Sequence, residues 1–139
     1  MVVGSEIIFL CGLTSLAQAR KTKEAIWKNR AHESLKKVKQ LAKDSPSNYQ
    51  HKLLLLEAEC AFISGRIKKA TEKYELAVAM SKKNDFIQDQ ALSYELASKF
   101  YAEQRNEKKA SHYYGKAHDL YLEWGATGKA DHLRENSPF

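Results

Sequence analysis

The pattern of hydrophobic and polar positions along the chain is that of amphipathic helices almost throughout. Apolar residues recur three or four positions apart, which is the spacing that places side chains on one face of a helix. The breaks are short: Pro46 disfavours helical geometry in the residue before it, and Gly65 and Gly125 suit the left-handed conformation that ends a helix. The pattern predicts helices over about 5–20, 24–43, 49–64, 67–82, 86–104 and 107–124, a short one over 126–135, and joints at 21–23, 44–48 and 83–85.

An internal repeat relates these helices to one another. The repeated unit is a small residue, then a ring four positions later, then a second small residue three positions after the ring. It occurs twice, 40 positions apart, as Ala70, Tyr74 and Ala77 and then as Ala110, Tyr114 and Ala117. A weaker copy lies upstream at Ala31, Leu35 and Val38. The small residues let two helices approach closely, and the ring fills the space between hairpins. The repeat predicts three helical hairpins, over about 5–43, 49–82 and 86–124, with a cap over about 126–135, in a single domain over 1–139.

This triplet is typical of the second helix of a tetratricopeptide-type repeat. The preceding helices supply the other core and turn positions of such a repeat, which are Leu54, Ala58, Ala61 and Gly65 and then Tyr94, Ala97, Ser98 and Tyr101. Trp124 is expected to pack under the last turn of its helix. The period near 40 exceeds the roughly 34 residues of the standard unit, so the joints are longer. The expected fold class is all-α, a tetratricopeptide-like α-solenoid of about three helical hairpins plus a short C-terminal capping helix.

The composition supports a helical chain, and its charge balance bears on whether the partner is a nucleic acid. Among 139 residues, 6 are Gly and 2 are Pro, too few for the turns of an all-β protein. Lys and Arg total 23 against 17 for Asp and Glu, a net charge of +6. The basic residues occur as small groups with acidic neighbours, which indicates a solvated helix surface rather than one contiguous basic face. A nucleic-acid-binding helical repeat that uses this basic surface therefore stays the alternative and is not favoured.

The cysteines and the apolar start of the chain bear on location. Cys11 and Cys60 have neither a CxxC partner nor a histidine at metal-ligand spacing, so they are expected to be small core residues in a reducing, intracellular compartment, the cytoplasm above all. The apolar run from Ile7 to Ala19 imitates a signal peptide. The residues before it carry an acid and no Lys or Arg, and the run is too short and too polar to span a bilayer, so neither secretion nor a membrane span is expected.

Three stretches of the chain resemble one group of signalling proteins. They are 51–59, with the sequence HKLLLLEAE, then 84–101, and 121–126, with the sequence YLEWGA, followed by Lys129. Over about 27–133 the chain is similar to the helical-repeat region that follows the predicted ATPase module in multi-sensor serine/threonine-histidine kinases. The nucleotide-binding and kinase motifs of those proteins do not occur here, so the resemblance implies a scaffold or relay role without ATP chemistry.

The titratable residues do not form a recognisable catalytic or metal site. No two of the five histidines stand four apart on one helix beside a carboxylate, and Glu57 and Glu59 are two apart and so point in different directions. No Ser or Cys has the context of a nucleophile. The aromatic residues are expected to pack between hairpins rather than to stack on bases. The sequence therefore predicts no catalytic residue, no metal, no cofactor and no small-molecule ligand.

The remaining prediction is a surface for a protein partner. If the hairpins form a groove, the first helix of each should line it with Lys52, Leu55, Glu59 and Phe62 and then with Leu92, Glu95, Lys99 and Ala102. Ile7, Ile8, Phe9 and Leu13 offer apolar surface in the first hairpin, which predicts a docked partner, a larger assembly or self-association there. The sequence thus predicts a non-catalytic protein-interaction or scaffold module.

Overall fold

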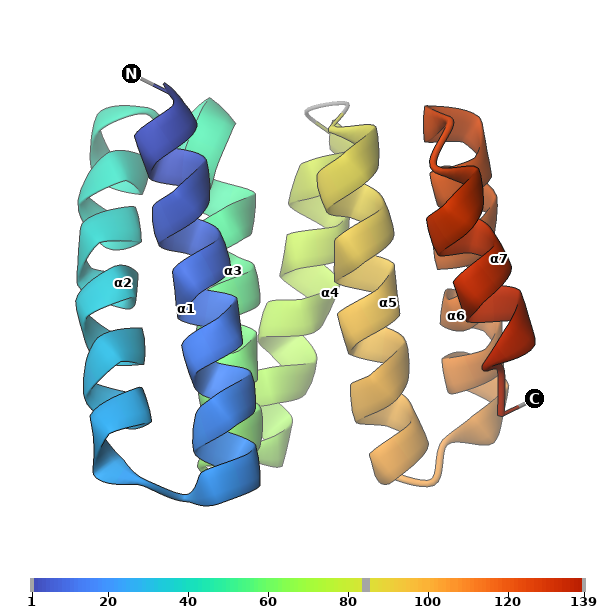
Figure 1. The fold of residues 1–139 in the computed structure, drawn as a ribbon, viewed down its shortest axis with the longest axis horizontal. Coiled ribbons are helices and arrows are strands. Elements are labelled where there is room, and N and C mark those ends of the chain that lie inside the picture. Colours follow the sequence, from blue (N-terminus) through green and yellow to red (C-terminus); the bar gives the residue numbers. More distant parts are fainter. Residues whose placement is uncertain (1, 84–85, 139) are drawn as a thin grey trace. The chain divides into compact units, whose positions relative to one another are not determined.

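The computed structural model describes residues 2–83 and 86–138, and within these residues it contains seven α-helices and no strand (Figure 1). The predicted all-α class and the helical hairpins are confirmed. The helices are α1 (Val2–Thr22), α2 (Ala25–Asp44), α3 (Pro46–Ile63), α4 (Ile67–Lys83), α5 (Ile87–Glu103), α6 (Glu107–Trp124) and α7 (Thr127–Glu135).

The predicted joint at 44–48 is much shorter than expected, because α3 begins at Pro46. A proline suits the first position of a helix, since its missing N–H would be unpaired there and its fixed φ fits the helix. The N–H of Ser45 donates to the carbonyl of Leu41, and the N–H of Tyr49 donates to the carbonyl of Ser45. Ser45 is therefore the only non-helical residue between α2 and α3. The predicted joint at 83–85 includes residues 84 and 85, which lie outside the described residues.

The turns that follow α3 and α5 have the same backbone structure, 40 positions apart. Gly65 has a φ of +75° and Arg105 a φ of +61°. In the first turn Arg66 N–H donates to Ala61 O at 2.8 Å, and in the second Asn106 N–H donates to Tyr101 O at 2.9 Å. These bonds satisfy carbonyls that the end of a helix leaves unpaired. The 40-residue period of the sequence is thus present in the backbone of the two turns.

The chain divides into two compact units, one up to Ala77 and one from Val78 onward. In the first unit α1, α2 and α3 each contact the other two, and Figure 1 shows them side by side. A Cβ added at Gly12 of α1 would lie 2.9 Å from Leu56 Cδ2 on α3 and 3.1 Å from Ser34 Cβ on α2. Gly12 therefore stands where the three helices approach one another closely. The hydrophobic core of this unit includes Phe9, Leu16, Ala31, Val38, the run Leu53–Leu56 and Tyr74.

In the second unit α6 packs against both α5 and α7. Its buried cluster consists of Val78, Ala91, Tyr94, Ala117, Tyr121, Ala130 and Leu133. The ring of Tyr113 packs edge-on against Tyr94 at 5.0 Å and Tyr101 at 5.5 Å, measured between centroids. Burial of apolar surface in this cluster holds α7 against the hairpin of α5 and α6.

Most predicted core positions of the repeat are buried. They are Leu54, Ala58, Ala70, Tyr74, Ala77, Ala97, Tyr101, Ala110 and Ala117. Tyr114 is only partly buried. Gly65 and Gly125, with φ of +75° and +92°, end their helices as predicted.

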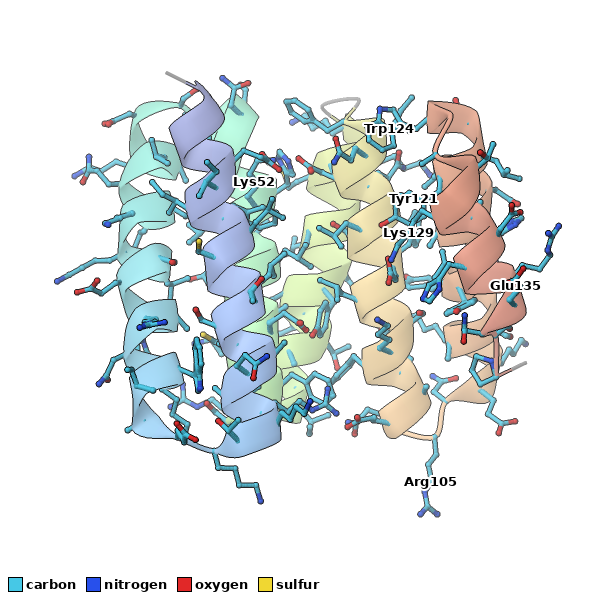
Figure 2. The ribbon with its side chains drawn as sticks, in the orientation of Figure 1. Lys52, Arg105, Tyr121, Trp124, Lys129 and Glu135 are labelled. Carbon is cyan, nitrogen blue, oxygen red and sulfur yellow. The ribbon has the colours of Figure 1, made fainter. Side chains whose placement is uncertain are left out.

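The prediction for Trp124 is wrong, because its side chain is 50% exposed at the end of α6 (Figure 2). Ala130 and Leu133 of α7 are buried in one cluster with Tyr121 of α6, and Trp124 is not part of this cluster. No helix among the described residues has the length and apolar character needed to cross a membrane.

Candidate functional site

α1 is apolar on two faces, and the described structure covers only one of them. The covered face includes Phe9, Gly12, Leu16 and Ala19. On the other face the side chain of Ile7 is 55% exposed and that of Leu10 is 47% exposed. The exposed stripe consists of Ile7, Leu10, Cys11, Thr14 and Ala17, which recur at helical spacing. A helix that is hydrophobic all round is normally buried all round, so this stripe is a candidate contact surface.

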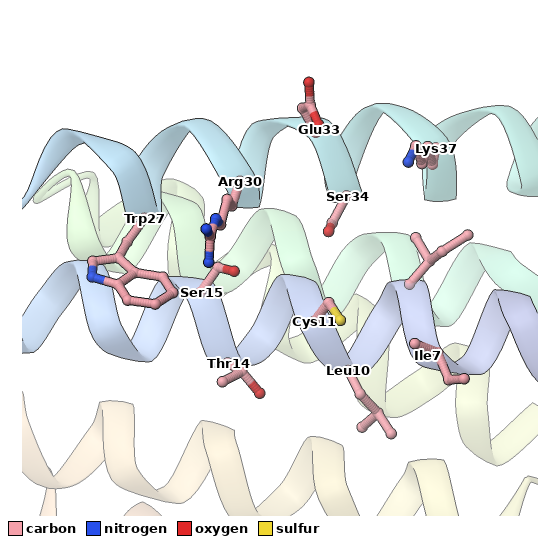
Figure 3. Close-up of a pocket in the computed structure, with 11 residues that line it drawn as sticks. Ile7, Leu10, Cys11, Thr14, Ser15, Trp27, Arg30, Glu33, Ser34 and Lys37 are labelled. Atoms are coloured by element: carbon pink, nitrogen blue, oxygen red, sulfur yellow. The ribbon is translucent and has the colours of Figure 1, made fainter.

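A groove of about 540 Å³ runs between this stripe and α2 (Figure 3). The α1 wall is uncharged and consists of Ile7, Ile8, Leu10, Cys11, Thr14 and Ser15. The α2 wall carries two basic side chains and one acidic one and consists of Trp27, Arg30, Glu33, Ser34 and Lys37. The guanidinium of Arg30 lies 5.0 Å from the centroid of the Trp27 ring, which is cation–π geometry.

Small residues explain why the groove forms at this place. Gly12 on α1 and Ser34 on α2 let the two helices approach closely, as the Cβ position at Gly12 shows. The larger side chains of Trp27, Arg30 and Lys37 then stand along one side, spaced three and seven residues apart on a single helical face. Figure 3 shows Trp27 and Lys37 at opposite ends of the groove.

The residues predicted to line a groove on α3 do not form an open surface. Lys52 and Leu55 are buried. The Lys52 ammonium lies 3.1 Å from a carboxylate oxygen of Glu6 and 5.0 Å from the centroid of the Phe9 ring, so α1 covers this part of α3. The prediction missed this because it placed Lys52 on the lining of a groove between hairpins, whereas α1 packs over that part of α3.

The other two predicted residues of α3 are partly buried against neighbouring helices. The hydroxyl of Tyr74 on α4 donates to the carboxylate of Glu59. Burial, together with the charge of Glu59, raises the pKa of Tyr74 well above its ordinary value. The guanidinium of Arg20 lies 4.4 Å from the centroid of the Phe62 ring. These contacts tie α3 to α4 and α1.

Three of the four predicted residues of α5 line a second cavity, of about 320 Å³, in the second unit. Glu95, Lys99 and Ala102 lie here, whereas Leu92 does not line it. The remaining wall comes from Ser98, Tyr114, His132, Leu133, Asn136 and Pro138. The structure therefore brings three of the four predicted α5 residues together, but opposite α7 rather than opposite another hairpin.

Glu95 is buried at the edge of this cavity and its carboxylate is well satisfied. Tyr121 Oη donates to Oε1 at 3.0 Å, and the ammonium groups of Lys129 and Lys99 lie 3.2 and 3.3 Å from Oε2. Figure 2 shows Tyr121 and Lys129 beside one another. Burial, and then the charge of Glu95, raises the pKa of Tyr121. This arrangement anchors three helices and has the character of a structural network.

Two further groups of polar residues bear on metal binding and on thiol chemistry. Within the described ranges no three His, Cys, Asp or Glu side chains lie close enough to hold a metal ion. A mixed polar cavity of about 410 Å³ in the first unit includes Cys60, and burial, followed by the charges of Glu59 and Glu57, raises the pKa of its thiol. A raised thiol pKa lowers the thiolate fraction and so opposes nucleophilic reactivity.

The exposed stripe of α1 is the surface that the sequence predicted least completely. Ile7 is exposed as expected, but Phe9 is buried, and Leu10, Cys11 and Trp27 were not singled out for contact. The sequence did contain a sign of this surface, because the run from Ile7 to Ala19 carries no charge on either face.

Comparison of the chain with protein-family models, curated proteins and solved structures finds no match.

Proposed function

We propose that the chain is a non-catalytic protein-interaction module whose contact surface is the α1–α2 groove. The observation that carries this proposal is the exposed apolar stripe of α1, in which Ile7 and Leu10 are each about half exposed. Burying such a stripe against a partner would release about 25 cal/mol for each Å² of apolar surface removed from water. The mechanism is surface burial and needs no chemical step.

The finer architecture proposed here is a tetratricopeptide-like array of hairpins. It is supported by the repeat of small buried residues at Ala70 and Ala110 and at Ala77 and Ala117, and by the matching turns at Gly65 and Arg105. The resemblance to the repeat region of multi-sensor kinases supports a role in a signalling assembly. Cys11 is exposed on α1, so the expectation that it is a small core residue is wrong; an intracellular, reducing compartment remains part of the proposal from the sequence.

A nucleic-acid-binding repeat is the second candidate, and the charge of α2 is the observation that favours it. This helix carries six basic side chains against two acidic ones. Phosphate contacts would use these residues but would leave the apolar wall of α1 unused, so the protein-interaction proposal accounts for more of the groove.

The test is affinity capture from the native source with quantitative mass spectrometry, using the chain and two matched variants. Leu10→Asp places a charge on the exposed stripe, whereas Leu122→Asp makes the same change at a leucine of α6 that is 45% exposed. A protein recovered with the unchanged chain and with Leu122→Asp, but lost with Leu10→Asp, is the expected result. Equal recovery with all three baits, loss of capture on nuclease treatment, or recovery of the chain alone and monomeric would contradict the proposal.

A further inference from the structure

The shape of the groove suits a helix. The α1–α2 pair already accepts one helix, α3, on another face, where Leu56 packs at Gly12. Along α1 the groove extends from Ile7 to Ser15. At a rise of 1.5 Å for each residue this is about 12 Å, or roughly two helical turns. A helix that occupies it would present apolar side chains at positions i, i+3 or i+4, and i+7.

The charges that line the groove indicate which charges a bound helix should carry on its flank. The α1 wall has no charged residue, and the α2 wall has Arg30 and Lys37, seven residues apart, against the single acid Glu33. Two basic side chains seven apart stand about 10 Å apart along one side of α2. An occupant that carries carboxylates at the same spacing would meet both. A second copy of this chain would instead bring another strongly basic α2 toward the first, which like-charge repulsion opposes.

We propose that the α1–α2 groove binds an amphipathic helix of a partner protein that has an aliphatic face and an acidic flank. This inference rests on the proposed function and adds the chemistry of the partner. The aliphatic face packs on Ile7, Leu10 and Cys11, and the acidic flank lies along Arg30 and Lys37. Binding falls with rising salt concentration, because the charged groups at the rim remain close to solvent.

The structure supplies two reporters inside the groove. Trp27 lies in its wall, and replacing the only other tryptophan, as Trp124→Phe, leaves Trp27 as the sole source of tryptophan fluorescence. Cys11 is an exposed thiol in the same groove, and Cys60→Ser removes the other cysteine. The full chain with both substitutions therefore reports occupancy by fluorescence and by protection of Cys11 from a thiol reagent.

The probe is a synthetic helix-forming peptide of about 15 residues, a length at which a helix becomes sustainable in water. It carries leucines at i, i+3 and i+7 and glutamates along one flank. Three peptides of the same length serve as controls: one with lysines in place of the glutamates, one of the same composition with the leucine stripe scrambled, and polyglutamate.

The expected result is that the acidic helix changes Trp27 fluorescence and protects Cys11, whereas the three controls bind more weakly. Lys37→Glu should weaken binding of the acidic helix by roughly two- to fivefold, the effect of an exposed charge pair, and strengthen binding of the lysine peptide. Lys116→Glu, which makes the same change of net charge at an exposed lysine of α6, should leave both affinities unchanged.

Several results would overturn the inference. Equal binding of the acidic and lysine peptides would contradict the acidic flank assigned to the partner. Equal binding of polyglutamate would contradict its aliphatic face. Binding without protection of Cys11 would place the peptide elsewhere, and protection that depends on protein concentration without peptide would make a second copy the occupant. If capture from the native source still depends on Leu10 while the acidic helix fails to bind, the proposed function stands and only this inference fails.

Discussion

The hydroxyl of Tyr121 on α6 donates a 3.0 Å hydrogen bond to Oε1 of Glu95 on α5, and the ammonium of Lys129 on α7 lies 3.2 Å from Oε2 of the same carboxylate. One buried acid thus joins three helices of the second unit. Hydrogen bonds to a buried charged group contribute more to stability than hydrogen bonds between neutral groups. Removal of one donor leaves the buried carboxylate less well satisfied. The bond has consequences for stability at neutral and at alkaline pH.

Tyr121→Phe should destabilise the second unit by about 1–3 kcal/mol at neutral pH, because the buried carboxylate loses a donor. The pKa of Tyr121 is raised above its ordinary value of 10.0 by burial and by Glu95. Above pH 10 Tyr121 therefore holds its proton in the folded chain and loses it in the unfolded one, so stability falls as the pH rises, by at most about 1.4 kcal/mol for each pH unit from this residue.

The measurement is denaturant unfolding of the unchanged chain and of Tyr121→Phe between pH 7 and a pH above the ordinary tyrosine pKa. The variant should lose stability less steeply on the alkaline side. Part of the slope should remain, since the pKa of Tyr74 is also raised. Parallel alkaline slopes for the two proteins would show that Tyr121 does not keep its proton in the folded chain.

Gly12→Ala and Gly115→Ala should have opposite effects on stability. The added methyl at Gly12 would lie 2.9 Å from a methyl of buried Leu56, so overpacking should cost about 1–3 kcal/mol. At Gly115, within α6, nothing lies within 4 Å of the added Cβ, so the better helix propensity of alanine should add about 0.8–1 kcal/mol. Thermal unfolding of the two variants checks both signs, and a neutral Gly12→Ala would contradict the close approach of α1, α2 and α3.

Arg105→Gly and Gly65→Ala form a second matched pair, at equivalent positions of two turns. Arg105 has a φ of +61°, which costs a residue with a Cβ about 1–2 kcal/mol, so glycine should stabilise the chain by about 1 kcal/mol. Gly65 has a φ of +75°, and alanine there should destabilise by about the same amount. The free energy of unfolding from denaturant titrations gives both values. Destabilisation by Arg105→Gly would mean that the arginine side chain contributes more than the strain costs.

The two cysteines should differ in reactivity toward a disulfide reagent. Cys11 is exposed on α1, whereas Cys60 is half-buried and burial raises the pKa of its thiol. The thiolate is the reacting form, so Cys11 should react faster and Cys60 should need a higher pH. Rates for the single variants Cys11→Ser and Cys60→Ser between pH 7 and 9 test this. Similar rates for the two thiols would contradict the described burial of Cys60.

The sequence by itself determined the helices, their hairpin turns and most of the repeat core, because these depend on local spacing. Ala70, Tyr74 and Ala77 follow from helical periodicity, and Gly65 and Gly125 from the conformations open to glycine. The positive φ of Arg105 could be read only by analogy with Gly65, because arginine carries no such preference. The start of α3 at Pro46 did not follow from the proline alone, because a proline can lie in a loop after one helix or occupy the first position of the next helix.

Tertiary structure decided which apolar and charged residues are covered. Lys52 is buried because α1 packs over α3 and brings Glu6 and Phe9 to it, and Trp124 is exposed because α7 packs on the Tyr121 side of α6. Neither outcome is a property of the residue or of its own helix. The candidate groove has the same origin: the sequence shows that α1 is apolar on two faces, but only the packing of α2 and α3 determines that Phe9 is covered and Leu10 is not.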